Sequence, residues 1–97
     1  MELFLGRLGR DPELKYTPNR VPVCHLSVAI NKGEDEKPEW KKVIVWNKQA
    51  ELCSLYLKKG KEVFVKGETE KKEFTTKEGE RKEYFEVNAK VIGFTNI

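Results

Sequence analysis

The sequence contains few of the residues from which metal sites are built. Its 97 residues include one histidine, His25, and two cysteines, Cys24 and Cys53, without a Cys-x-x-Cys pair. The ligand count therefore falls short of a structural zinc site, which needs four ligands. Both cysteines lie in apolar stretches, which predicts buried, reduced thiols; the alternative is a disulfide or a redox role.

Catalytic motifs are also missing. No serine or cysteine is paired with the single histidine by a motif spacing, and no glycine-rich phosphate loop is present. The many carboxylates lie beside lysines in polar runs, which is typical of a solvated surface. We therefore expect a protein with no enzymatic activity, no metal and no cofactor.

Long hydrophobic runs are absent as well. The segment Met1 to Gly6 lacks the basic start and long apolar stretch of a signal peptide, and no run approaches the length of a membrane span. We therefore expect a cytoplasmic protein. The formal net charge of +3 permits a nucleic-acid partner without requiring one, because 19 basic residues are mixed with 16 acidic ones.

The chain does contain the alternation of apolar and polar residues that is typical of strands. Its length suits one domain with one core, so we expect residues 1–97 to form a single domain that functions on a surface or in a groove. Period-two patterns predict five strands. These are Glu2 to Leu8, Val23 to Ile30, Trp40 to Trp46, Glu62 to Phe74 and Tyr84 to Phe94.

Helix and turn signals separate these strands. The segment Lys48 to Lys59 has the apolar spacing of a helix, with Asn47 as its N-cap and Gly60 just after its C-terminus. The polar segment 31–39 predicts a hairpin loop, and 77–80 predicts a second turn. Gly67 predicts a bulge or bend within its strand.

This order of elements predicts an all-β OB-fold, a five-stranded Greek-key barrel with one helix between strands 3 and 4. Barrels of this kind often bind oligonucleotides or oligosaccharides. In the last strand we expect four residues to face the barrel interior: Phe85, Val87, Ala89 and Val91.

The third predicted strand carries the main functional signal. At period two, Trp40, Lys42 and Trp46 share one face, while Val43 and Val45 lie on the other and can supply the core. Two indoles and a lysine on one face suit a single strand of nucleic acid, because bases stack on the rings and the cation attracts phosphate. The alternative is that both tryptophans are core residues or fill an oligomer interface.

Phe74 is a third candidate for base stacking. It has no apolar residue within five positions on its N-terminal side, which is unusual for a core aromatic. The alternative is packing across the hairpin onto Tyr84 or Phe85. Basic residues around it can contact phosphate, although nearby glutamates dilute their field. They are Lys66, Lys71, Lys72, Lys77, Arg81 and Lys82.

Four segments resemble the bacterial single-stranded DNA-binding protein family over essentially the full length of the chain. They are LGRDPELKYTP from Leu8 to Pro18, EW with a basic pair and VIVW from Glu39 to Trp46, AELCSLYLKKG from Ala50 to Gly60, and VFVKGE from Val63 to Glu68. Each motif alone is weak, and the four together are specific.

The resemblance implies an OB-fold subunit that coats single-stranded DNA with little sequence preference in replication, recombination and repair. It also implies a homotetramer, with a dimer as the alternative, and association with the nucleoid. By position, Trp40, Trp46 and Phe74 match the family's stacking aromatics, the last of which is usually tryptophan. The family's basic contacts are matched by Lys42, Lys48, Lys59 and Lys72.

The chain departs from the family pattern at three places. Lys32 and Gly33 stand where many members carry a further tryptophan, so one stacking platform is missing. Lys41 stands where members often have a histidine near the subunit interface. After Ile97 there is no flexible linker or acidic tail of the kind that recruits other proteins.

The missing tail leaves two interpretations. The sequence is either a DNA-binding domain trimmed from a longer protein or a short member, such as a paralogue or a phage or plasmid version. Primosomal replication protein N shares the fold but lacks the clear LGRDPE and EW motifs. Alternative functions are a primosomal protein N-like or other OB-fold protein-interaction module, in which the aromatic face docks a replication partner, and an RNA-binding barrel.

Overall fold

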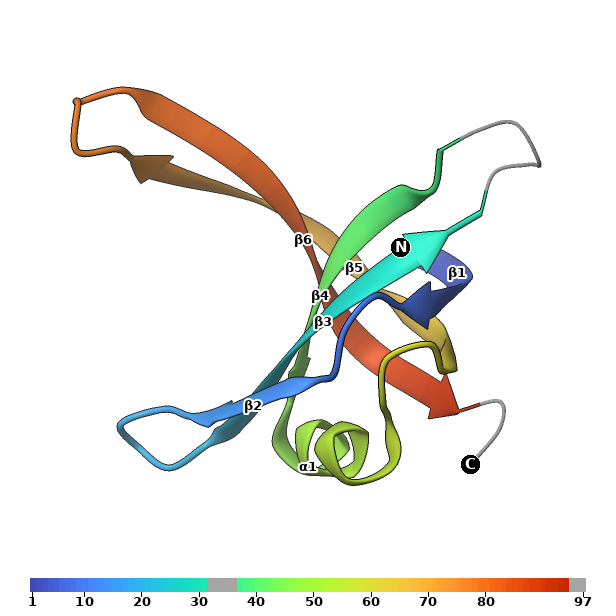
Figure 1. Cartoon of the computed structure of the whole chain (residues 1–97). Helices are drawn as coiled ribbons and strands as arrows, with labels where there is room; N and C mark the ends of the chain where they lie inside the picture. Colours follow the sequence, from blue (N-terminus) through green and yellow to red (C-terminus); the bar gives the residue numbers. More distant parts are fainter. Residues whose placement is uncertain (32–36, 95–97) are drawn as a thin grey trace.

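The computed structural model describes residues 1–31 and 37–94 (Figure 1). Most of the predicted loop 31–39, with the departures at Lys32 and Gly33, lies outside these residues. Within them the chain forms six strands and one helix. These are β1 (Glu2–Leu8), β2 (Glu13–Tyr16), β3 (Pro22–Ile30), β4 (Glu39–Trp46), α1 (Asn47–Tyr56), β5 (Glu62–Thr75) and β6 (Arg81–Phe94).

Five of the strands close into a barrel. The sheet runs β1-β5-β6-β4-β3, and β3 returns to pair with β1 through Arg7 opposite Ala29 and Leu8 opposite Val28. The β4–β6 pairing is parallel, whereas the other pairings are antiparallel. The five barrel strands are the five predicted ones, and α1 lies between the third of them, β4, and the fourth, β5. The predicted OB-fold is therefore confirmed.

Alternation in the sequence does not predict strand β2. It pairs with β3 from Glu13 opposite His25 to Tyr16 opposite Pro22, and so continues along β3 beyond the point where β1 ends. Its alternation is too short to recognise, because Leu14 is the one apolar residue in it besides the exposed Tyr16. The LGRDP segment therefore lies between two strands, β1 and β2, that both pair with β3.

The core fills the barrel and the space between the barrel and α1. Its fully buried side chains are mainly valines: Val28, Val43, Val45, Val63 and Val65. Cys24 and Cys53 are free, buried thiols within this cluster, as predicted. Burial raises the pKa of Cys24 to about 11 and that of Cys53 to about 12, so both thiols are protonated at neutral pH.

The helix is shorter than predicted and is capped differently. It ends at Tyr56, and Leu57 is the C-cap, so Gly60 lies in the following turn, where its N–H donates to the carbonyl of Leu8. Asn47 is the first helical residue rather than the N-cap, and no side chain in the described part of the chain caps the helix with a hydrogen bond. Asn47 has φ of +62°, a left-handed conformation that asparagine tolerates better than most residues.

Two of the four inward predictions for the last strand are wrong. Val87 and Ala89 are buried, but Phe85 is 61% exposed and Val91 is 47% exposed. A register shift explains Val91. Lys66 pairs with Val91 and Gly67 with Ala89, so Lys90 is an extra residue that reverses the alternation.

Gly67 lies at this bulge, as predicted. A Cβ at Gly67 would overlap the carbonyl oxygen of Asn88, so the close approach of β5 to β6 requires glycine here. Beyond it the two strands leave the barrel as a long hairpin that projects away from the body of the molecule (Figure 1). Phe85 lies on this hairpin, and the residues that the structure describes leave most of its ring exposed.

The side chain of Gln49 links α1 to the other side of the bulge. Its Nε2 donates to the carbonyl of Lys90 at 3.1 Å, and its Oε1 accepts from the N–H of Ile92 at 3.1 Å. Gln49 thus binds β6 beyond Asn88, where the pairing of β4 with β6 stops.

Candidate nucleic-acid interface

Strand β4 separates a core face from an exposed face. Val43 and Val45 are fully buried, as predicted, whereas Trp40 is 56% exposed and Trp46 is 38% exposed on the opposite face. Lys42 is also exposed on that face. Neither tryptophan belongs to the core, so the core alternative is wrong for both, and the alternative that they fill an oligomer interface stays a prediction.

The outer face of β4 is long enough for several nucleotides. Trp40 and Trp46 are six residues apart on one strand, which places their backbones roughly 20 Å apart. Ile44, between them, is buried. Lys48 follows on the first turn of α1 and is exposed, at the Trp46 end of this row.

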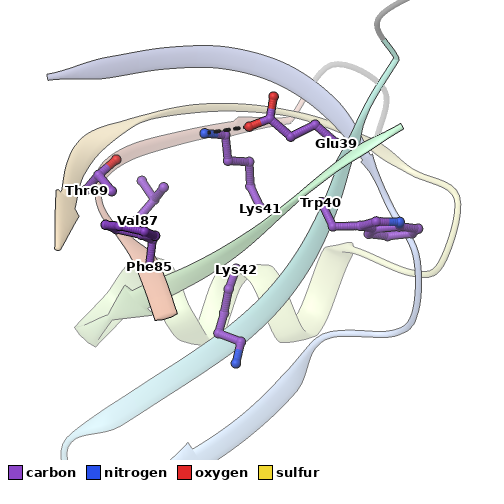
Figure 2. A pocket seen from close by; sticks show the side chains of 7 residues that line it. All are labelled: Glu39, Trp40, Lys41, Lys42, Thr69, Phe85 and Val87. Atoms are coloured by element: carbon purple, nitrogen blue, oxygen red, sulfur yellow. Dashed lines mark ion pairs between the residues drawn. The ribbon is translucent and has the colours of Figure 1, made fainter. Parts of the chain in front are cut away.

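The side chain of Lys41 points away from Trp40 and Lys42, into a pocket between β4 and β6. Figure 2 shows Lys41 extended toward Glu39, while Lys42 extends in the opposite direction and the Trp40 ring turns away from Phe85. The Nζ of Lys41 is 2.9 Å from Glu2 Oε1 and 3.1 Å from Glu39 Oε2. The hydrogen bond to Glu2 is the main reason why the pKa of Lys41 is raised.

The β5–β6 hairpin brings Phe74 to the same side as Lys42. Phe74 is 47% exposed, and its ring centroid lies 5.8 Å from that of Tyr84 with the planes tilted by 58°. The Nζ of Lys42 lies 4.6 Å from the centroid of the same Tyr84 ring. The predicted alternative of packing onto Tyr84 is therefore confirmed, although Phe74 keeps much of its surface exposed.

Alternation in the sequence does not single out Tyr84 as a candidate interface residue. The signal that could have found it is the hairpin register, which sets Lys72 opposite Tyr84 and Phe74 opposite Lys82. Diagonal neighbours in such a ribbon share a face, so Phe74 and Tyr84 must lie together once the turn is placed.

Acidic neighbours hold some of the hairpin lysines. Lys72 Nζ lies 3.1 Å from Glu70 Oε2, and this hydrogen bond raises the pKa of Lys72 and lowers that of Glu70. Lys71 pairs with Glu83 at 2.8 Å on the opposite face of the hairpin. A phosphate at Lys72 would therefore compete with Glu70.

The structure also bears on sites for other ligands. Among the residues it describes, no cluster of three or more histidine, cysteine, aspartate or glutamate side chains could hold a metal ion. Within the same ranges, no helix is long and apolar enough to cross a membrane.

Known sequences resemble this chain along nearly all of it. A profile of the single-strand binding protein family matches residues 2–95. The chain belongs to this family. Among the relatives of the single-strand binding protein family, a single-stranded DNA-binding protein of Neisseria meningitidis serogroup A is 35% identical over 104 residues, which cover 97% of this chain and 60% of that protein. Another, from Halalkalibacterium halodurans, is 40% identical over 98 residues, which cover 95% of this chain and 58% of that protein. This chain thus spans about three fifths of the length of these relatives.

In this member of the single-strand binding protein family, the LGRDP segment contacts residues at one end of the candidate interface. A Cβ at Gly9 would overlap Cζ3 and Cη2 of Trp40, so the indole lies directly against the Gly9 backbone. Asp11 Oδ1 accepts a hydrogen bond from the backbone N–H of Lys59 at 2.9 Å. The motif therefore packs against one stacking candidate and fixes the backbone of one basic candidate.

The seven predicted residues divide into groups. Lys42, Lys72 and Phe74 lie around Tyr84. Trp40 lies against Gly9, and the backbone of Lys59 is bonded to Asp11 of the same LGRDP segment. Trp46 and Lys48 lie at the C-terminal end of β4 and the start of α1. Their contacts with nucleic acid stay a prediction.

Proposed function

We propose that the chain binds single-stranded DNA across the outer face of β4 and the adjoining face of the β5–β6 hairpin, with little preference for base sequence. The observation that carries the proposal is the exposure of Trp40 and Trp46 directly behind a fully buried core face. Exposed indoles on a rigid strand can stack bases, and each stacked base contributes about 1–3 kcal/mol.

The basic residues would neutralise phosphates beside these rings. Lys42, Lys48, Lys59 and Lys72 are all exposed and lie on β4, α1, the turn after α1 and the hairpin. In this proposal the chain acts as one single-stranded DNA-binding domain and catalyses no reaction. It would protect exposed strands during replication, recombination and repair, at the nucleoid in the cytoplasm.

A homotetramer is part of the same proposal. Leu3 and Leu5 of β1 are 62% and 52% exposed, and Lys66 lies between Leu3 and Val91 in the sheet. Leu3, Leu5 and Val91 share the outer face of β1, β5 and β6 with Lys66, and such exposed apolar side chains on one face support burial against a second copy. Light scattering should report four times the 11.3 kDa chain mass for a tetramer, and twice that mass for the alternative dimer. Leu3→Glu with Leu5→Glu should lower that mass.

Tryptophan fluorescence tests the proposed binding directly. Oligo-dT should quench Trp40 and Trp46, affinity should fall with salt, and Trp40→Ala and Trp46→Ala should each weaken binding. Phe85→Ala is the control, because Phe85 is an exposed aromatic on the other face of the hairpin. Failure of oligo-dT to bind or quench would overturn the proposal.

Two competitors separate this function from its alternatives. Oligo-U should bind more weakly than oligo-dU if DNA is the ligand, since these two strands differ only in the 2′-hydroxyl. A protein-docking module would retain its partner when oligo-dT is added. If oligo-dT displaces a replication partner, the DNA binds the aromatic face of β4, and this result counts against the docking module.

A further inference from the structure

The ring of Tyr84 joins two parts of the proposed interface that come from different elements. Lys42 on β4 places its Nζ 4.6 Å from the Tyr84 centroid, within the range of a cation–π interaction. Phe74 on β5 packs against the same ring at 5.8 Å, in a tilted geometry that aromatic pairs favour.

Tyr84 itself is less accessible than the residues that it contacts. It is partly buried, whereas Phe74 is 47% exposed and Lys42 is exposed. A base that stacked fully on Tyr84 would have to displace one of these neighbours. The ring is therefore better placed to support Phe74 and Lys42 than to serve as a stacking platform.

The hairpin gains from such a support, because within the described residues no backbone pairing joins its outer part to β4. The β4–β6 pairing is limited to Val43 opposite Val87 and Ile44 opposite Asn88. Beyond this point β5 and β6 pair with each other as a two-stranded ribbon, and such ribbons twist more strongly than wider sheets. The Lys42 to Tyr84 contact links β4 to that ribbon.

We propose that Tyr84 is a positioning residue of the single-stranded DNA interface, which holds the Phe74 ring and the Lys42 ammonium in one fixed arrangement. This inference rests on the proposed function. The aromatic ring does this without its hydroxyl, so Tyr84→Phe binds like the unaltered protein. Tyr84→Thr and Tyr84→Leu release both neighbours and weaken oligo-dT binding by roughly 3- to 30-fold.

The salt dependence of binding is the readout that a general loss of structure would not reproduce. If Lys42 loses its position, one phosphate contact is lost, and the slope of log affinity against log salt becomes shallower by about 0.7. Lys42→Gln should show the same change in slope, and Tyr84→Thr should add little to it. Phe85→Thr is the matched control, because it removes the neighbouring ring from the opposite face and leaves both contacts intact.

A double-mutant cycle separates positioning from direct contact. Combined with Phe74→Ala, Tyr84→Thr should cost less than the sum of the two single effects, because the second change removes a support that no longer has a ring to hold. Full additivity would overturn the positioning role and make Tyr84 an independent DNA contact.

Other outcomes are equally decisive. Unchanged affinity and slope in both Tyr84→Thr and Tyr84→Leu would also overturn the inference, as would a weakened Tyr84→Phe. Using two replacements guards against one that unfolds, and circular dichroism melts identify such a variant. If the unaltered protein fails to bind oligo-dT, the proposed function itself is wrong, which is a separate result.

Discussion

The two halves of β5 have opposite surroundings. In the barrel half, Val63 and Val65 are fully buried, whereas every residue from 71 to 75 in the hairpin half is exposed. Gly67 separates the halves at the bulge. The barrel half buries apolar surface and so stabilises the fold, while the hairpin half buries little apolar surface and leaves its side chains in solvent, where our proposal places the ligand. Substitutions in the two regions should therefore alter different measurements.

A core truncation should give the largest change and should affect stability alone. Leu26 is 3% exposed within the barrel, and Leu26→Ala should lower the free energy of unfolding by about 2–5 kcal/mol because it leaves a cavity. Urea denaturation at fixed protein concentration measures this loss, and the folded variant should keep its oligo-dT affinity. Leu55→Ala, at a residue 69% exposed, should change stability by less than about 0.5 kcal/mol. Equal losses in the two variants would break the comparison.

Alkaline pH should weaken the barrel through its two thiols. Both folded pKa values, about 11 for Cys24 and about 12 for Cys53, lie above the ordinary value of 9.0. The unfolded chain therefore releases these protons first. Above about pH 9 the free energy of unfolding should fall by up to about 1.4 kcal/mol per pH unit for each thiol, and below that pH the stabilisation is fully present.

Urea denaturation between pH 7 and 10.5 tests this dependence. The variant Cys24→Ala with Cys53→Ala retains the other titrating groups, so it is the control for the slope. It should lack the steep part of the curve that we assign to the thiols. Parallel curves for the two proteins would show that thiol burial does not cause the loss.

Truncation of the hairpin aromatic should affect binding and leave stability unchanged. Phe74→Ala should weaken oligo-dT binding by about 1–3 kcal/mol, because one stacking ring is removed. The thermal midpoint should stay within a few degrees of that of the unaltered protein, since Phe74 lies outside the core. Fluorescence titration and thermal melts give the two numbers. A large drop in the midpoint would show that the hairpin supports the barrel.

Removal of an acidic neighbour should produce the smallest change, and in the opposite direction. Glu70→Gln frees Lys72 from its ion pair and removes a charge that repels phosphate. Affinity for oligo-dT should rise roughly two- to fivefold, with a steeper salt dependence. Glu83→Gln is the control, because its partner Lys71 faces the other side of the hairpin. An equal gain in both variants would indicate a general charge effect.

The sequence predicts the barrel well, because alternation has a physical cause there. Val43 and Val45 face a packed interior while Trp40 faces solvent, so period two distinguishes the two faces of β4. Gly67 was also predictable, since a close approach of two backbones excludes a side chain.

Elsewhere alternation does not report burial. The extra residue at Lys90 reverses the faces of β6 and exposes Val91, and no local pattern announces it. On the hairpin neither face is buried, so the apolar Phe85 carries no information about an interior. The contact of Tyr84 with Lys42 joins residues 42 positions apart, and it emerges only once the register of the hairpin and the course of β4 are known.

The side chain of Gln49 hydrogen-bonds the carbonyl of Lys90 and the N–H of Ile92, on either side of Val91. In a parallel pair of strands, the backbone of a residue on β4 would make these same two bonds to β6. The side-chain amide thus stands in for main chain after the strand has turned into a helix. This substitution sets a length rule for the junction between Val45 and Lys48. Inserting or deleting one residue there would rotate the amide by about 100° around the helix axis and leave the end of β6 without its partner.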